Sequence, residues 1–201
     1  MASTPQTSAM ARLVERLARL PGIGNRSAQR LAFYLLKASA EEANELAAAI
    51  TDLKRNTRQC SVCCNVSETD PCPICTDDRR DHGLVLVVEQ PGDLATIEST
   101  GMYRGVYHVL MGRLAPLDGL GAGELHIDPL IQRIEAGGIR EVIIGTNPTL
   151  EGDGTGLYLV KQLERLGVKI TRLARGLPTG ANLEMVSKAV LADALQGRQT
   201  V

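Results

Sequence analysis

The cysteines of this chain are confined to one short segment and are spaced for metal binding. All five lie between Cys60 and Cys75, and four of them form two C-x-x-C pairs, Cys60 with Cys63 and Cys72 with Cys75. A C-x-x-C turn presents two thiolates to one side, and two such turns facing each other make a tetrahedral sulfur site that suits zinc. Because protein would fill all four positions, no place is left for water or substrate. We therefore expect one structural zinc ion per chain.

Other uses of these thiols are less well supported. Two disulfides are possible, but nothing else in the sequence points to an oxidising compartment. A redox-active pair is expected at a strand-to-helix turn, and neither pair lies at one. Cys64 is interpreted as a bystander thiol. Zinc would order the polar segment Asn65–Asp70, because structural zinc contributes about 10–16 kcal/mol in finger peptides.

A second candidate site lies near the amino terminus, where glycines interrupt a helical pattern. Gly22 and Gly24 separate two amphipathic stretches, and Asn25 is a plausible N-cap of the second. Glycines let a backbone approach closely, and free amides at a helix start point at an anion. Arg26 and Arg30, one turn apart, could pair with successive phosphates. The segment resembles a helix-hairpin-helix turn that contacts the DNA backbone. The alternative is a tight turn between helices with solvated arginines.

Composition and charge narrow the class of protein. The chain has 201 residues, 44% of them hydrophobic, and a net charge of −1, as in a globular protein with a sizeable core. The charge is uneven, because residues 1–37 hold six basic residues against Glu15 alone. Aromatics are only 2%, which disfavours base stacking. No apolar run approaches the ~20 residues of a membrane span, and residues 1–10 do not read as a secretory signal. We expect a cytoplasmic protein with no membrane partner.

The rest of the chain alternates between strand and helix patterns. Such alternation predicts a parallel sheet whose ligand end is its carboxyl edge. The expected strands are Leu84–Val88, Gly105–Leu110, Glu141–Gly145 and Val168–Leu173. The expected helices here run up to Ile97 and over Ile127–Glu135 and Gly154–Leu166, with one over Glu41–Asn56 before the cysteines. Glu89 and residues 147–153 should meet at the carboxyl edge of the sheet.

This edge is similar to that of the Toprim domain of topoisomerases and primases. The matching stretches are Val88-Glu89 and Ile143–Asp153. In that family a strand-end glutamate works with a D-x-D pair, often followed by E-G-E, to hold magnesium. Here Glu89 matches the glutamate, Glu151-Gly152-Asp153 matches E-G-E, and the D-x-D positions hold Asn147 and Thr149. Losing two carboxylates removes most of the charge that would fix Mg²⁺. We expect the Toprim fold without phosphoryl-transfer chemistry.

The order of helical hairpin, four-cysteine finger and Toprim unit resembles the RecR family of bacterial recombination mediators across nearly the whole chain. Supporting stretches are Leu20–Gly24, Ser27–Phe33, Glu89–Asp93, Tyr103–Gly105, Tyr107–Leu110, Thr146–Asp153 and Arg172–Gly180, continuing through Gly197–Gln199. The carboxyl end resembles the segment called Walker B-like in this family, with Ala181 and Met185 replacing its usual second glycine and tyrosine. No Walker A motif occurs, so ATP hydrolysis is not expected.

The resemblance implies an α/β protein with a helical N-terminal part, divided into four regions. These are a helix-hairpin-helix DNA-binding and oligomerisation region (1–57), a C4 zinc finger (58–80), a Toprim domain (81–174) and a C-terminal helical, Walker B-like oligomerisation segment (175–201). It also implies a homodimer and a ring-shaped homotetramer that surrounds single- or double-stranded DNA near the bacterial nucleoid. The family acts with RecO and RecF to help load RecA at gaps.

The expected site residues follow from these readings. DNA would be contacted by Gly22, Gly24, Arg26 and Arg30, and no residue is expected to be catalytic. A basic partner such as RecO would contact the acidic Toprim edge formed by Glu89, Glu151 and Asp153. Two alternatives remain open: a Mg-dependent Toprim phosphotransferase, either a nuclease or a primase-like enzyme, and a structural zinc protein without a nucleic-acid partner.

Overall fold

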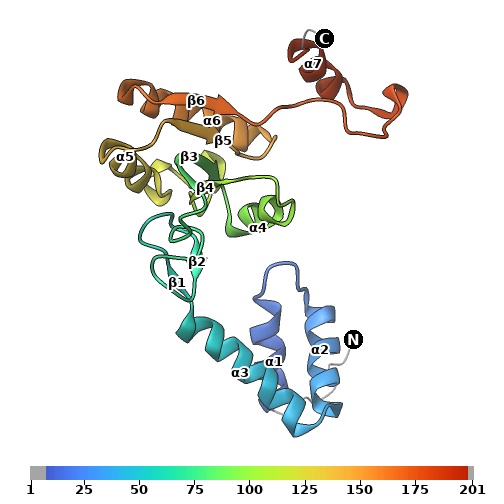
Figure 1. Ribbon diagram of the computed structural model, residues 1–201. Coiled ribbons are helices and arrows are strands. Elements are labelled where there is room, and N and C mark those ends of the chain that lie inside the picture. The colour runs from blue at the N-terminus through green and yellow to red at the C-terminus, as the bar shows by residue number, and fades with distance from the viewer. Residues whose placement is uncertain (1–7, 199–201) are drawn as a thin grey trace. The chain divides into compact units, whose positions relative to one another are not determined.

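The computed structural model describes residues 8–198, which form two compact units with their boundary between Thr57 and Arg58. Figure 1 shows a helical first unit and a second unit built around a sheet. Two segments named in the sequence interpretation fall outside the described residues. They are residues 1–7 of the polar amino-terminal stretch and residues 199–201 of the Walker B-like segment.

The first unit begins with a helical hairpin. Helices α1 (Ser8–Ala18) and α2 (Asn25–Lys37) pack side by side. Their small core contains Val14, Ala28 and Ala32, and the alanines are at most 1% exposed. Short side chains on α2 let the two helix backbones approach closely. The hairpin therefore depends on a few tight contacts and not on a large apolar core.

The turn between α1 and α2 differs from the sequence prediction. Asn25 was expected to cap α2, and that prediction is wrong, since Asn25 is the first helical residue and Gly24 is the N-cap. Gly22 adopts a left-handed φ of 79°, a conformation that glycine enters without steric cost. The Ile23 N–H donates to the Leu20 carbonyl at 3.1 Å. The left-handed turn thus leaves Gly24, whose backbone is extended, as the residue that starts the helix.

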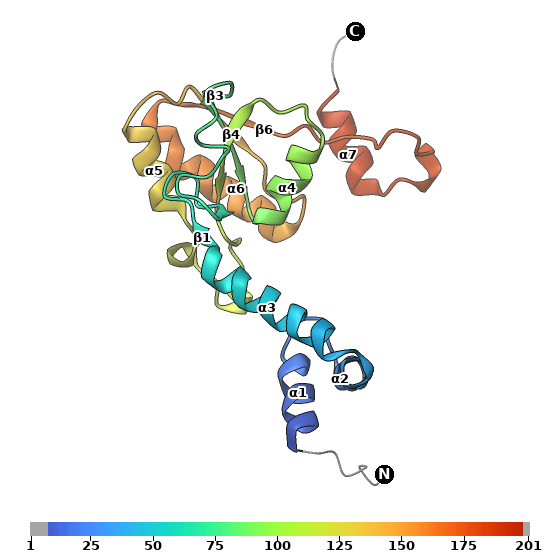
Figure 2. The same ribbon diagram turned by 60° about the horizontal axis from the view of Figure 1, so that its bottom comes forward.

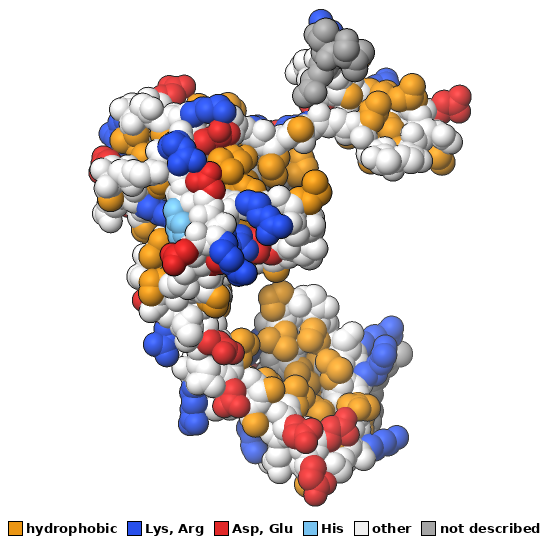
Figure 3. All heavy atoms as spheres, in the orientation of Figure 1, with side chains coloured by type: hydrophobic (Ala, Val, Ile, Leu, Met, Phe, Trp, Pro, Cys, Tyr) orange, Lys and Arg blue, Asp and Glu red, His pale blue; other side chains and the backbone are white. Residues whose placement is uncertain are grey.

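Helix α3 (Ala40–Asn56) completes the first unit and buries none of its residues there. Its start is well defined, because Ser39 Oγ accepts the Glu42 N–H at 3.1 Å. The Tyr34 hydroxyl donates to Glu42 Oε1 at 2.6 Å. Large apolar side chains of α2 and α3 remain exposed: Leu31, Phe33, Tyr34, Leu36, Leu46, Ile50 and Leu53. Figure 3 shows hydrophobic side chains gathered on this unit.

The second unit contains a parallel sheet, as the sequence predicts. Its strand order is β4-β3-β5-β6, and every neighbouring pair is parallel. The strands are β3 (Asp81–Val88), β4 (Gly105–Val109), β5 (Glu141–Ile144) and β6 (Lys169–Arg172). The helices between them are α4 (Pro91–Ser99), α5 (Ile127–Glu135) and α6 (Leu150–Leu163), followed by a 3₁₀ turn at Glu164–Leu166. Two further 3₁₀ turns, Pro116–Asp118 and Ala122–Glu124, lie in the loop after β4.

Both faces of this sheet are covered. Val85 and Val87 of β3 pack with Leu130 of α5 and Leu159 of α6. Leu86 and Val88, which point to the opposite face, pack with Leu94 of α4 and Tyr107 of β4. Figure 2 shows α5 and α4 on opposite sides of the strands. The uninterrupted apolar run of β3 follows from this burial on both sides.

Helix α6 begins earlier than the sequence predicts, and this changes the setting of the acidic residues. It starts at Leu150 and not at Gly154, because Thr149 Oγ1 caps it by accepting the Gly152 N–H at 3.1 Å. Two glycines in the first turns lower helix propensity, but packing at the sheet edge overrides it. Glu151 and Asp153 consequently lie on a helix. Leu157 of this helix is 69% exposed.

The ends of the second unit are less regular. Strands β1 (Arg58–Gln59) and β2 (Val66–Ser67) pair antiparallel within the cysteine-containing segment. After β6 the chain passes through a 3₁₀ turn at Leu183–Met185 to helix α7 (Lys188–Gln196). Within residues 8–198, no helix combines the length and apolar character that crossing a membrane requires.

Candidate functional site

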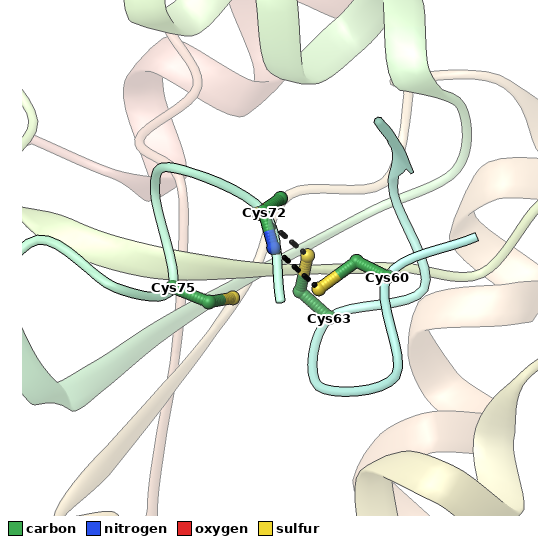
Figure 4. Close-up of side chains that lie close together, drawn as sticks. All are labelled: Cys60, Cys63, Cys72 and Cys75. Atoms are coloured by element: carbon green, nitrogen blue, oxygen red, sulfur yellow. Dashed lines mark hydrogen bonds between the residues drawn. The ribbon is translucent and has the colours of Figure 1, made fainter. Parts of the chain in front are cut away.

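The four predicted zinc ligands come together in the finger. The sulfur atoms of Cys60, Cys63, Cys72 and Cys75 all lie within 4.8 Å of one another. Figure 4 shows the four side chains gathered in one place. The sulfurs of Cys63 and Cys72 are 3.6 Å apart. Zinc–sulfur bonds of about 2.3 Å in a tetrahedron require sulfurs about 3.8 Å apart. The sulfur cage therefore has the dimensions and donor chemistry that zinc needs.

The electrostatics of the cluster also suit a cation. Cys60, Cys63 and Cys72 are at most 2% exposed. A hydrogen bond from Cys63 lowers the pKa of Cys72, whereas the pKa of Cys63 is raised by the same contact. The Cys72 N–H also donates to Cys60 Sγ at 3.3 Å. Without a metal, the four thiols could not all be ionised in this interior. A zinc ion would replace the shared proton and offset part of the negative charge of the four thiolates.

Cys64 lies beside the cluster but does not belong to it. Burial is the main reason that the pKa of its thiol is raised, so this thiol stays protonated and unreactive. Its φ of 60° lies in the left-handed region, where the chain turns after Cys63. Cys64 contributes backbone to the finger, since its carbonyl accepts a hydrogen bond from Gln59 Nε2 at 3.2 Å.

The finger closes one edge of the sheet. Strand β4 is an end strand, and the Val109 N–H donates to the Cys63 carbonyl at 2.8 Å. Ile74, between the second pair of cysteines, packs against the finger core and against both faces of the sheet. Because exposed edge strands invite aggregation, the finger protects β4. Zinc thus stabilises both its own loops and the strand that they cover.

The predicted phosphate-binding residues are exposed on the first unit. Arg26 and Arg30 lie in α2, and among the described residues no ion pair engages either guanidinium. The first turn of α2 contains no acidic residue, and Gly24 offers no side chain to cap its amides. The first backbone N–H groups of α2 are therefore free for an anion. A Cβ added at Gly22 or Gly24 would meet no atom within 4 Å, so both glycines lie open to a ligand.

Glu89, predicted to contact a partner, instead lies in the interior. It is 2% exposed. Its Oε1 accepts the Asn147 backbone N–H at 2.7 Å, and its Oε2 accepts the Asn147 side-chain amide at 2.9 Å. Both carboxylate oxygens are thus engaged within the unit. The side chain does not reach the surface, so the structure gives no support to the prediction that Glu89 contacts a partner.

Asp153 is accessible but already paired. Its carboxylate forms ion pairs with Arg172 at the end of β6 and with Arg175 just beyond it. The hydrogen bond from Arg175 is the main reason that the pKa of Asp153 is lowered to about 2. Glu151, two residues earlier on α6, is exposed. The structure therefore brings Glu89 and Asp153 to the predicted edge, yet leaves Glu151 as the one exposed carboxylate of the three.

Several residues at this edge escaped the sequence interpretation. Asn147 was noted only for lacking a carboxylate, and the arginines Arg172 and Arg175 only as part of a family-like segment. A further one is Thr155, whose hydroxyl donates to the Glu151 carbonyl at 2.7 Å and accepts the Leu114 N–H at 2.9 Å. No local pattern signals the long-range contacts, which join segments far apart in the chain.

Comparison with known proteins gives matches along nearly the whole chain. Three family models match: a RecR helix-hairpin-helix model over residues 10–54, a RecR zinc finger model with four cysteine ligands over 57–77, and a Toprim domain model over 83–174. The finger model spans all four cysteines. Together with the sulfur geometry, it identifies one structural zinc ion. The predicted combination of hairpin, finger and Toprim fold is confirmed.

Curated relatives are similar over nearly their full lengths. The chain is 51% identical to "Recombination protein RecR" of Rhodopirellula baltica over 191 residues, covering 95% of this chain and 96% of the relative. It is 51% identical to the protein of the same name from Pelotomaculum thermopropionicum, covering 94% and 95%. The Moorella thermoacetica protein, also of that name, is 49% identical, with 93% and 94% covered.

Proposed function

This chain belongs to the RecR family, and from that membership we propose that it acts in recombinational DNA repair as a non-catalytic mediator that binds DNA. Specifically, it forms a ring-like clamp on DNA and works with RecO and RecF to help load RecA at gaps. The work would take place in the bacterial cytoplasm, at the nucleoid. The observation that carries this proposal is that Arg26 and Arg30 lie exposed beside the free amides of α2 and form no ion pair within residues 8–198.

The hairpin supports binding to the DNA backbone and not to particular bases. Arg26 and Arg30 project from the start of α2, next to the open glycines Gly22 and Gly24. Guanidinium groups and backbone amides bind phosphate oxygens, which are the same at every base pair. Such contacts suit repair at arbitrary sequences, on single or double strands. One hairpin is a weak site, so several copies on one ring would be needed for stable binding.

Assembly into dimers and tetramers is supported by the apolar surface of the first unit. Helix α3 has no buried residue, and Leu36, Ile50 and Leu53 are each 59–69% exposed. Contiguous exposed apolar surface on a folded unit marks an interaction site. A second copy of the chain would bury these side chains and would place several hairpins around one DNA path.

Absence of catalysis is supported by the way the Toprim edge is occupied. Phosphoryl transfer needs clustered carboxylates that hold hard cations. Here the Glu89 carboxylate binds Asn147, and the Asp153 carboxylate binds two arginines. Glu151 alone remains exposed, and we propose it as the contact for a basic partner such as RecO. RecO binding that is unchanged by Glu151→Lys would contradict this part of the proposal.

DNA binding can be tested by comparing two variants that each lose two positive charges, one at the proposed site and one elsewhere. The variant R26A/R30A removes two guanidiniums one turn apart on α2. The control K161A/R165A removes two exposed positive charges, also four residues apart, from the end of α6 and the turn after it. Both variants change net charge equally, so non-specific attraction falls equally. Fluorescence anisotropy of labelled duplex, measured over a series of salt concentrations, separates site loss from charge loss.

The expected result concerns the salt dependence as well as the affinity. Each phosphate contact contributes about 0.9 to the slope of log affinity against log salt on duplex DNA. R26A/R30A should therefore lower that slope by about 1.8 for each chain that contacts the DNA. The control should stay close to the wild type. Equal slopes for wild type and R26A/R30A would reject the hairpin as the DNA site.

A further inference from the structure

The carboxyl edge of the sheet, where the Toprim resemblance implies a magnesium site, contains a closed hydrogen-bonded pair. Glu89 ends the run of β3, and Asn147 follows β5, the neighbouring strand. The two Glu89 oxygens accept the Asn147 backbone N–H at 2.7 Å and the Asn147 side-chain N–H at 2.9 Å. The carboxylate is almost fully buried, so these contacts must supply what water would otherwise provide.

The residues present do not fit magnesium. Mg²⁺ requires oxygen ligands at about 2.0–2.1 Å in an octahedron. At the position nearest Glu89 Oε2, this chain offers the amide nitrogen of Asn147, which is a donor and cannot ligate a cation. Asp153, the last carboxylate of the Glu-Gly-Asp stretch, is engaged by Arg172 and Arg175. The carboxylate of Glu89 is thus satisfied by hydrogen-bond donors, and the carboxylate of Asp153 by two arginines.

Close packing shows how completely this edge is filled. A Cβ added at Gly152 would lie 2.7 Å from Glu89 Oε1 and 2.1 Å from the Asn147 carbonyl oxygen. The first turn of α6 therefore presses directly onto the Glu89–Asn147 pair. The pair fixes the turn that precedes Thr149, and Thr149 caps α6.

From these contacts we propose that the side-chain amide of Asn147 takes the place of a divalent cation at Glu89. The two donors of this residue, one from the side chain and one from the backbone, satisfy the buried carboxylate without metal. Glu89 is then a positioning residue that acts through Asn147 on the start of α6 and on the exposed Glu151. This inference concerns the sheet edge alone and does not depend on DNA binding by the first unit.

A swap of the two functional groups provides the test. In E89Q, the new amide faces the donor of Asn147. In N147D, a second carboxylate faces Glu89. In the double variant E89Q/N147D, the glutamine oxygen can still accept the backbone N–H of residue 147, while its amide donates to the new aspartate. The double variant has the same net charge as the wild type. All four proteins keep the zinc site loaded and are melted at pH 8 in buffer freed of magnesium.

The expected result is a non-additive cycle. N147D should melt about 3–12 °C below the wild type, because a second carboxylate then faces the buried Glu89 carboxylate. E89Q should lose less, because it removes the buried charge and the Asn147 amide can rotate to accept from the new amide. The double variant should recover most of that loss, which independent sites cannot do. Millimolar MgCl₂ should raise the Tm of N147D, in which two carboxylates face each other, and should leave the wild type and the double variant unchanged. DNA affinity should be the same in all four, so a failure of DNA binding would be seen separately.

Two results would overturn the proposal. The first is a double variant no more stable than the weaker single variant, which would show that the amide–carboxylate pairing is not what stabilises the edge. The second is a wild-type Tm that rises with MgCl₂ and loses this rise in E89Q, which would show that Glu89 holds a cation. If N147D does not fold without magnesium, its refolding yield with and without MgCl₂ replaces the Tm, and E89Q/N147D still decides the pairing.

Discussion

Replacing Gly152 by alanine should strongly destabilise the second unit. Gly152 lies in the first turn of α6, where an added Cβ would be 2.1 Å from the Asn147 carbonyl oxygen and 2.7 Å from Glu89 Oε1. Heavy atoms do not approach this closely, so the backbone at Asn147 or the start of α6 must move. That movement would also lengthen the 2.7 Å hydrogen bond from the Asn147 N–H to Glu89.

The size of the effect follows from these contacts. Forcing a methyl group into a filled site costs about 1–3 kcal/mol. Weakening a hydrogen bond to a buried charged group costs about 1.5–3 kcal/mol. Alanine recovers up to about 1 kcal/mol of helix propensity relative to glycine. The sum predicts that G152A lowers the free energy of unfolding by about 2–5 kcal/mol.

Gly154 provides a matched control two residues along the same helix. An added Cβ there would meet no atom within 4 Å, so G154A should stabilise α6 by about 0.5–1 kcal/mol through propensity alone. Urea denaturation followed by the near-ultraviolet signal of the tyrosines reports mainly on the second unit, which contains three of the four, Tyr103, Tyr107 and Tyr158. The fourth, Tyr34, lies in the first unit and is 60% exposed. The midpoint should fall for G152A and rise for G154A. Equal midpoints for the two variants would refute the close approach at Gly152.

Two further predictions concern the finger and the sheet. Removing zinc with a chelator should speed amide hydrogen exchange at Val109, whose N–H donates to the Cys63 carbonyl. Exchange at Val142, in the inner strand β5, should stay slow. Equal acceleration at both amides would contradict a local role of the zinc finger in protecting β4. Burial lowers the pKa of His108 to about 4 from its usual 6.5, so its neutral form contributes stability that is complete above pH 6.5. The free energy of unfolding should fall by about 3 kcal/mol as the pH drops from 6.5 to 4. If the stability of H108L falls as steeply as that of the wild type over this range, His108 is not the cause of the loss.

The features that the sequence predicted are those fixed by local spacing. Two C-x-x-C turns place sulfurs in pairs whatever the surrounding fold, so the metal cluster at Cys60–Cys75 followed from the spacing alone. The apolar run of β3 likewise requires burial on both faces, which a parallel sheet supplies. In each case a few neighbouring residues determine the geometry, and longer-range contacts only add to it.

The features that the sequence missed depend on contacts between distant segments. Nothing near Glu89 indicates that its oxygens would bind Asn147, 58 residues away. Nothing near Asp153 indicates its pairing with Arg172, at the end of the next strand, and with Arg175 just beyond it. The sequence placed the acidic residues at the correct edge of the sheet. Whether their carboxylates are free or engaged depends on residues that are distant in the chain. This is why the sequence did not indicate that Glu89 is buried.

The pairing of charges also explains how a protein with a net charge of −1 can present a locally cationic surface. In the second unit many cationic side chains have acidic partners: Arg80 with Glu98, Arg140 with Asp81, Lys169 with Glu141, and Arg172 and Arg175 with Asp153. In the first unit, the described ion pair joins Arg19 to Glu15, and Arg26 and Arg30 have no acidic partner among the described residues. Paired charges produce little field beyond a Debye length of about 8 Å. A polyanion therefore encounters the unpaired guanidiniums of α2, and the net charge of the chain is a poor guide to where DNA would bind.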